Sequence, residues 1–227
     1  MKSGRGKTPR ILVVDYGMGN LRSVTKALES LGAQVAVSAS SRAFGRVDGV
    51  VLPGVGAFAE AMVRMRRLGL ARPLGEWITA DRPFLGICLG YQLLFDSSTE
   101  FGNHRGLGFF PGRVVPFSRR LRVPHMGWNT LKAAKEGWLL AGLGRNPYVY
   151  FVHSYYVKPG RRADTAATTE YGVRFAAAVE RGAVAGVQFH PEKSQRTGLT
   201  ILRNFLAEVG RWQSQRAPKP QRLWRSA

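Results

Sequence analysis

The sequence contains one cysteine, Cys88, which stands between two glycines in the pattern G-x-C-x-G. A short apolar run, Pro83 to Cys88, has the length of a buried strand. The next residues, Leu89 to Phe95, place apolar side chains on one face of a helix. At such a turn the thiol stands clear of the sheet, and the unpaired N–H groups of the helix start favour a thiolate and a developing oxyanion. The pattern therefore predicts a nucleophile, with a buried structural cysteine as the common alternative.

One of the four histidines, His190, is suited to activate that thiol. It directly follows a predicted strand, and Glu192 comes two residues later in the tripeptide His-Pro-Glu. Because proline bends the chain out of the strand, the carboxylate can turn back to orient the imidazole. Cys88, His190 and Glu192 would then form a triad that attacks a carbonyl, forms a thioester and hydrolyses it. A solvent-exposed turn is the alternative for His-Pro-Glu alone.

No cofactor is expected from the sequence, and no metal site either. A metal ion held by Cys88 and the histidines is a conceivable alternative to the triad. No pair among these residues has the ligand spacing of usual zinc sites, so the sequence does not favour it.

The surrounding sequence predicts an α/β fold that places these groups at one edge of a sheet. Before residue 95, strands are expected at 11–17, 34–38, 49–53 and 83–88, and helices at 20–31, 57–68, 74–80 and 89–95. This alternation implies a mostly parallel central sheet flanked by helices, with the active site at the carboxyl ends of the strands. Cys88 and the glycine turn Gly54 to Gly56, whose N–H groups can bind a substrate, would both lie there.

The second half of the sequence has a different character. From about residue 97, glycine and proline become frequent and short alternating runs replace helices. These runs are expected to extend the sheet in a partly antiparallel region, before a closing helix at 197–209. The strands are expected at 112–117, 128–132, 148–157, 165–171, 174–180 and 184–189.

The chain has 227 residues, which suits a single α/β domain at 11–209. Residues 1–10 are expected to form a basic flexible arm, and residues 210–227 a basic, disordered tail. One cysteine cannot form an internal disulfide, so a reducing compartment is the natural setting. No apolar run is long enough for a signal peptide or a membrane span, and we expect a cytoplasmic protein.

The formal net charge is +20. Such a charge makes contacts with nucleic acid, phosphorylated metabolites or an acidic partner protein plausible. Solvated surface charge is the simpler interpretation, because the sequence shows no recognised nucleic-acid-binding module.

Longer motifs resemble the class I, or triad, glutamine amidotransferases between about Ile11 and Leu206. The superfamily motifs are G-I-C-L-G-Y-Q at 86–92 and Q-F-H-P-E at 188–192. Four further motifs resemble the HisH subfamily, the glutaminase subunits of imidazole glycerol phosphate synthase in histidine biosynthesis. They are P-G-V-G at 53–56, P-H-M-G-W-N at 124–129, Y-F-V-H-S-Y-Y at 150–156 and H-P-E-K-S at 190–194.

The resemblance implies a glutaminase mechanism. Cys88 would attack the side-chain amide of glutamine and release ammonia, with His190 as base and acid and Glu192 as the group that orients it. The oxyanion hole would use the backbone N–H of Leu89 and one from Val55 or Gly56, which in this family is thought to be aimed correctly only when the partner is engaged. The residues that match the glutamine-binding positions of the family are Gly54, Gly56, Gln92, Ser154 and Tyr155.

The resemblance also implies a heterodimer with a HisF-type (β/α)8-barrel cyclase. That subunit would use the ammonia to make imidazole glycerol phosphate and AICAR. Positions matching the interface are Asn20, Met126, Trp128, Tyr150 and Lys193, the last as an ion-pair donor to an acid on the barrel. His153 is expected to be structural. Tyr91 stands where the family often has methionine and could alter the shape of the pocket.

Two other functions stay open at this point. An amidotransferase serving another synthase, such as one for sugar amidation, would use the same triad with a different partner. A basic binding module on an amidotransferase-like scaffold would use its charge to hold nucleic acid, although an intact triad argues against it.

Overall fold

Five parallel strands form one end of the main sheet in the computed structural model, which describes residues 7–216. Their order is β2-β1-β3-β4-β14, and their bounds are Gln34–Ser38, Arg10–Val14, Gly49–Gly54, Phe84–Cys88 and Val184–Val187. Every residue of β3, β4 and β14 is buried. Strands buried on both faces read as continuous apolar runs, which is why the sequence predicted them well.

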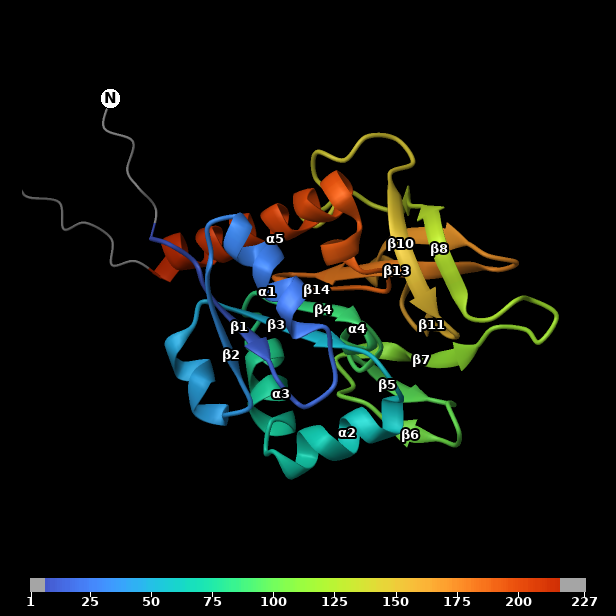
Figure 1. Cartoon of the computed structure of the whole chain (residues 1–227), viewed down its shortest axis with the longest axis horizontal. Coiled ribbons are helices and arrows are strands. Elements are labelled where there is room, and N and C mark those ends of the chain that lie inside the picture. The colour runs from blue at the N-terminus through green and yellow to red at the C-terminus, as the bar shows by residue number, and fades with distance from the viewer. Residues whose placement is uncertain (1–6, 217–227) are drawn as a thin grey trace, which may run out of the picture.

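Helices cover both faces of these strands, as Figure 1 shows. Helix α1 (Leu21–Ser30) and helix α5 (Gln195–Arg216) lie on one face, and α2 (Phe58–Arg67) and α3 (Ala71–Thr79) lie on the other. Each face has its own apolar core. The Asn20 side chain caps α1 by accepting from the backbone N–H of Ser23 at 3.4 Å, as its position predicts.

The second half of the chain extends the sheet with mostly antiparallel strands. They continue in the order β13-β11-β7-β5-β6, and β12 and β9 pair beside β13. Their bounds are Arg174–Arg181, Tyr155–Pro159, Phe110–Pro116, Phe95–Ser98, His104–Arg105, Thr165–Glu170 and Lys132–Ala133. Strands β8 (His125–Thr130) and β10 (Tyr148–His153) form a separate antiparallel sheet, called the β8–β10 sheet below. The expected α/β class, with its partly antiparallel region, is confirmed.

The prediction of a single strand at 148–157 is wrong. The segment is two strands, β10 and β11, that belong to different sheets and are divided at Ser154. The burial pattern explains the division. Alternate residues of β10 are buried up to His153, but the neighbouring residues Tyr156 and Val157 of β11 are both buried. The alternation that defines one strand face therefore breaks at the bend.

The helix expected at 89–95 is too long. Helix α4 spans only Leu89–Gln92, and Phe95 already begins β5. Residues 93–95 are fully buried, so their apolar side chains do not mark one face of a helix. The carbonyls of Leu93 and Leu94 instead accept from the backbone N–H groups of Leu107 and Phe109. The short strands β5, β6 and β9 were not predicted, because none carries a clear alternating pattern.

Both ends of the described chain are more regular than expected. Arg10, placed in the arm, begins β1 and forms an ion pair with Asp48 at 3.0 Å. Helix α5 continues to Arg216, beyond the expected end at Val209. The rest of the expected arm and tail, residues 1–6 and 217–227, lies outside the described residues. Among the helices of residues 7–216, none has the length and apolar character needed to cross a membrane.

Gly90 tests how closely α4 packs on β3. A Cβ at Gly90 would overlap the carbonyl oxygen of Leu52, whereas a Cβ at Gly75 in α3 would meet nothing within 4 Å. We expect Gly90→Ala to lower the free energy of unfolding by about 3 kcal/mol, because backbone must move to admit the methyl group. Gly75→Ala should instead raise it by about 0.5 kcal/mol, through a more favourable helix. Urea denaturation of both variants measures the difference, and equal effects would contradict the packing described.

Candidate active site

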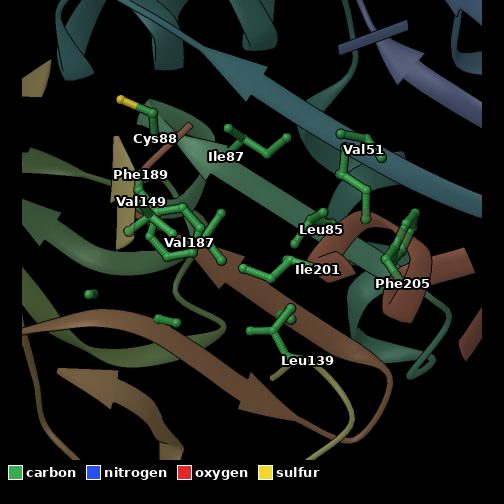
Figure 2. Close-up of a cluster of buried hydrophobic side chains, with 14 of the residues drawn as sticks. Val51, Leu85, Ile87, Cys88, Leu139, Val149, Val187, Phe189, Ile201 and Phe205 are labelled. Carbon is green, nitrogen blue, oxygen red and sulfur yellow. The ribbon is translucent and has the colours of Figure 1, made fainter. Parts of the chain in front are cut away.

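Three strand ends bring the predicted chemical groups together. Gly54 at the end of β3 lies opposite Cys88 at the end of β4, and Val187 at the end of β14 lies opposite Ile87. Gln188 therefore emerges beside Cys88. In Figure 2 the Cys88 sulfur stands at the carboxyl end of its strand and points away from the apolar cluster that includes Ile87.

The backbone of Cys88 adopts an unusual conformation. Its φ is 54° and its ψ is −108°, a backbone conformation that residues other than glycine rarely adopt. The turn is tight because Gly86 and Gly90 pack against each other: a Cβ at Gly86 would lie 2.7 Å from the carbonyl oxygen of Gly90. The thiol is only 7% exposed. The strand-to-helix turn predicted from G-x-C-x-G is confirmed, and the strain is the kind found where a side chain is aimed for chemistry.

The side chains of His190 and Glu192 form a buried pair beside the thiol. His190 Nδ1 lies 2.8 Å from Glu192 Oε1, and the two side chains are 3% and 1% exposed. Burial by itself lowers the pKa of His190, but the hydrogen bond to Glu192 and the negative charges of Cys88 and Glu192 outweigh it and raise the pKa to about 10. Nε2, the ring nitrogen left for the thiol, is buried and has no hydrogen-bond partner among the described residues. The arrangement favours a protonated imidazole beside the sulfur.

Tight backbone contacts hold the His-Pro-Glu segment, which forms the 3₁₀ helix η3 (Pro191–Lys193). The His190 N–H donates to the Tyr150 carbonyl of β10 at 2.9 Å. Ser194 Oγ donates to the His190 carbonyl at 2.6 Å and accepts from the Tyr150 N–H at 3.0 Å. The alternative of a solvent-exposed turn is thus excluded, and the position of His190 depends on the β8–β10 sheet.

Two glutamines lie beneath the thiol. Gln188 Nε2 lies 3.8 Å from Cys88 Sγ, and Gln188 Oε1 accepts from Gln92 Nε2 at 2.9 Å. Gln92 Nε2 also donates to the carbonyl of Tyr155 at 3.1 Å. Gln188 had no predicted role of its own, and the only signal in the sequence is its place two residues before His190.

Tyr16 is another residue that the sequence analysis missed. Its hydroxyl is buried, has no hydrogen-bond partner among residues 7–216, and packs so closely on Gly54 that a Cβ there would overlap it. Burial and the neighbouring charge of Cys88 raise the pKa of Tyr16 well above its usual value, so the hydroxyl keeps its proton. The only signal in the sequence is its place just after the first parallel strand, at the edge where sites form.

The remaining residues expected at the substrate site lie around Cys88 on different segments. Gly54 is buried beside it, whereas Val55 is 44% exposed in the turn that follows β3. Gly56 has a φ of 101°, which favours glycine at that position. Ser154 and Tyr155 lie at the junction of β10 and β11, and the Tyr155 carbonyl reaches the site through Gln92.

Four of the residues expected at a partner interface gather on the β8–β10 sheet and η3. Met126 and Trp128 are 62% and 46% exposed. The rings of Trp128 and Tyr150 lie 6.0 Å apart, and Lys193 Nζ lies 5.8 Å from the centre of the Tyr150 ring. Asn20 belongs to another segment, where its side chain caps α1, a helix that contacts η3. Large exposed apolar side chains beside a cation are typical of a docking surface.

A buried pair of histidines supports the β8–β10 sheet. His125 Nδ1 lies 3.0 Å from His153 Nε2, and aromatic rings surround both side chains. Burial lowers the pKa of His153 to about 3 and that of His125 to about 4, so both are neutral at physiological pH. The structural role expected of His153 fits this environment. Within residues 7–216, no group of three or more His, Cys, Asp or Glu side chains is placed to hold a metal ion.

A strand-to-helix cysteine with a buried His–Glu pair is what a thiol-based amide hydrolase requires. The family model for the class-I glutamine amidotransferases matches residues 12–209. The chain belongs to this family. The match to the class-I amidotransferases thus spans the whole sheet, from β1 to the middle of α5.

Among the amidotransferases, the chain is most informatively compared with curated relatives that share about half of its residues. A protein named imidazole glycerol phosphate synthase subunit HisH from Desulfitobacterium hafniense is 50% identical over 200 residues, covering 88% of this chain and 93% of that one. A protein of the same name from Aquifex aeolicus is 49% identical over 197 residues, covering 86% and 95%.

Solved structures agree on the fold of this amidotransferase. The structure of a putative GMP synthase component from Thermoplasma acidophilum aligns with a TM-score of 0.70 at 21% identity, covering 92% of this chain and 98% of that one. The structure of PurLQS from Thermotoga maritima aligns with a TM-score of 0.71 at 18% identity, covering 88% and 99%.

The low pKa of His153 leads to a prediction about acid stability. Its pKa is about 3 in the folded chain and about 6.5 when unfolded, so below pH 6.5 the unfolded state binds a proton that the folded state cannot. Folding stability should therefore fall as the pH drops from 6.5 towards 3. We expect His153→Phe to reduce the loss between pH 7 and pH 4.5 by about 2 kcal/mol. Urea titrations at several pH values measure this, and parallel curves for both proteins would contradict it.

Proposed function

We propose that this chain is the glutaminase subunit of an imidazole glycerol phosphate synthase and acts in histidine biosynthesis. The observation that carries the proposal is the buried His190–Glu192 pair beside Cys88, with 2.8 Å between the ring and the carboxylate. It occurs in a chain about half identical to curated proteins that bear the name of this subunit. The geometry of the site and the sequence similarity thus support the same reaction, the hydrolysis of glutamine.

In the first half of the reaction, the Cys88 thiolate attacks the side-chain carbonyl carbon of glutamine. The oxygen that becomes negative would be held by the backbone N–H of Leu89 and by one from Val55 or Gly56. The tetrahedral intermediate then collapses as the C–N bond breaks. His190 gives its proton to the departing nitrogen, which leaves as ammonia, and a glutamyl thioester stays on Cys88.

In the second half, water attacks the thioester and His190 accepts one of its protons. Collapse of this intermediate releases glutamate and returns the thiolate. Glu192 holds the imidazole in one orientation through both halves and offsets the charge of the imidazolium. The buried carboxylate is thus an orienting group rather than a proton carrier.

The orientation of Gln92 limits how it can hold glutamine. Both hydrogens of its amide nitrogen are used, one by Gln188 and one by the Tyr155 carbonyl. Only its oxygen is left, and an amide oxygen can only accept hydrogen bonds. Gln92 would therefore bind a donor group of the substrate, such as the α-ammonium or the side-chain amide. Gly54, Gly56, Ser154 and Tyr155 would complete the site.

The partner would be a HisF-type (β/α)8-barrel cyclase in the cytoplasm. Ammonia would pass from Cys88 into that subunit, which makes imidazole glycerol phosphate and AICAR. The surface offered by Met126, Trp128, Tyr150 and Lys193 supports this, because it borders the segment that carries His190. Asn20 would contribute at its margin. The word "subunit" in the relatives' names supports a partnership of this kind.

Replacing Cys88 tests the chemistry. We expect the purified wild-type chain to release little glutamate from glutamine alone and much more with a HisF-type cyclase and its nucleotide ligand. Cys88→Ala should lower the rate in the complex by more than about a thousandfold, since no nucleophile remains. It should still bind the cyclase with unchanged affinity in calorimetry. Glutamate release near the wild-type rate would refute the assignment of the nucleophile.

Replacing Lys193 tests the interface. We expect Lys193→Ala to lower the affinity for the cyclase about fivefold, the size of effect that a single interfacial ion pair gives. The weak activity of the free glutaminase should stay the same. Arg196→Ala is a matched control, because it removes the same charge from an exposed position three residues further along. Equal losses in the two variants would show that only net charge matters.

A further inference from the structure

A continuous line of buried hydrogen bonds begins at the Cys88 sulfur. Gln188 Nε2 lies 3.8 Å from Cys88 Sγ, Gln92 Nε2 lies 2.9 Å from Gln188 Oε1, and Gln92 Nε2 lies 3.1 Å from the Tyr155 carbonyl oxygen. Gln188 has no exposed surface and Gln92 is 6% exposed. Because water scarcely reaches them, each polar atom depends on the protein partner that it has.

The Tyr155 carbonyl decides which way these bonds run. A carbonyl can only accept, so Gln92 must turn its nitrogen towards Tyr155. That nitrogen then faces Gln188 as well, so Gln188 must present its oxygen to Gln92 and its own N–H to the sulfur. Strand β11 pairs with β13 only at Val157, which leaves the Tyr155 carbonyl free for side chains.

The same carbonyl also anchors the two buried histidines. His153 Nδ1 lies 2.7 Å from it and must donate, so His153 Nε2 accepts from His125 Nδ1 at 3.0 Å. His125 Nε2 is then the acceptor for Asn129 Nδ2 at 3.3 Å. Asn129 lies on β8, the strand that carries Met126 and Trp128. The Tyr155 carbonyl oxygen therefore belongs to one network of hydrogen bonds that extends from Cys88 to the strand where a partner is expected to dock.

We propose that Gln188 is a positioning residue that holds the Cys88 sulfur through its amide N–H, and that Gln92 acts through Gln188 by fixing the direction of that amide. A donor aimed at the sulfur stabilises a thiolate, whereas a reversed amide would set oxygen lone pairs against it. The proposal rests on the proposed role of Cys88 as nucleophile, and it gives Gln92 a second duty beside substrate binding.

Alkylation by iodoacetamide tests the proposal directly, because Cys88 is the only cysteine in the chain and the thiolate is the form that reacts. The full chain is labelled between pH 5 and pH 9, and the rates are read by mass spectrometry. We expect Gln188→Met to slow labelling about fivefold at pH 7 and to move the pH profile upwards, since the sulfur loses its donor. His190, Glu192 and Tyr16, the other titratable groups near the sulfur, are unchanged in this variant.

A second variant, Gln92→Met, tests whether Gln92 acts on the Cys88 sulfur only by orienting the Gln188 amide. Gln92→Met should also slow labelling, although Gln92 makes no hydrogen bond to the sulfur, because the Gln188 amide is then free to reverse. The double variant Gln92→Met/Gln188→Met should be no slower than Gln188→Met alone, since Gln92 acts only through Gln188. Additive effects would overturn that part of the proposal.

The matched control is Tyr91→Phe, because the Tyr91 ring is fully buried against Phe95 in the apolar core of the α2 and α3 face, a different core from that of Cys88. It removes another buried hydrogen bond of helix α4, from the Tyr91 hydroxyl to the Ala176 carbonyl, which lies outside the line to the sulfur. We expect its labelling rate to match the wild type. Unfolding cannot imitate the predicted result, because an unfolded chain exposes the thiol and labels faster. Equal rates for wild type and Gln188→Met would overturn the proposal.

The experiment uses neither glutamine nor a partner. If the wild-type chain released no glutamate with any cyclase, the proposed function would fail, while the labelling pattern would still decide the role of Gln188.

Discussion

The backbone of Cys88 sits in a conformation that costs free energy, and much of the architecture serves to keep it there. Its positive φ is held because α4 packs directly on β3, with Gly90 against the Leu52 carbonyl and Gly86 against Gly90. No side chain larger than hydrogen fits at either contact. The fully buried strands β3, β4 and β14 supply the rigid frame that this strain needs. The position of the Cys88 thiol thus depends on the close packing beneath it.

Because little water reaches the region around the Cys88 sulfur, each charge and hydrogen bond there has a strong effect. The side chains of His190 and Glu192 are almost fully buried, so their interaction is little weakened by water. The hydrogen bond to Glu192 and the negative charges of Glu192 and Cys88 overcome the effect of burial and raise the pKa of His190 to about 10. The opposite happens at His153, where burial among aromatic rings prevails and the pKa falls to about 3. The same fold therefore keeps one histidine charged and another neutral.

The β8–β10 sheet connects the candidate catalytic residues to the exposed surface at Met126 and Trp128. The backbone of Tyr150 in this sheet bonds the His190 N–H and the Ser194 hydroxyl, and its ring lies near Lys193 and Trp128. Through His153 the sheet also shares the Tyr155 carbonyl with Gln92. A molecule that docks on Met126 and Trp128 would press on a sheet that touches both halves of the site.

The sequence by itself determined the α/β class, the parallel strands and the grouping of Cys88 with His190. These rest on local signals: continuous apolar runs, glycines around the cysteine, and an acid two residues after a histidine at a strand end. Only the tertiary structure decided where residues 148–157 divide, how short α4 is, and that Gln188 and Tyr16 border the sulfur. It also decided the opposite charge states of the histidines. The physical reason is that these features depend on contacts between residues up to about a hundred positions apart. Such contacts decide which side chains are buried, which atoms bond and which sheet a strand joins, and they do not alter the local periodicity of the sequence.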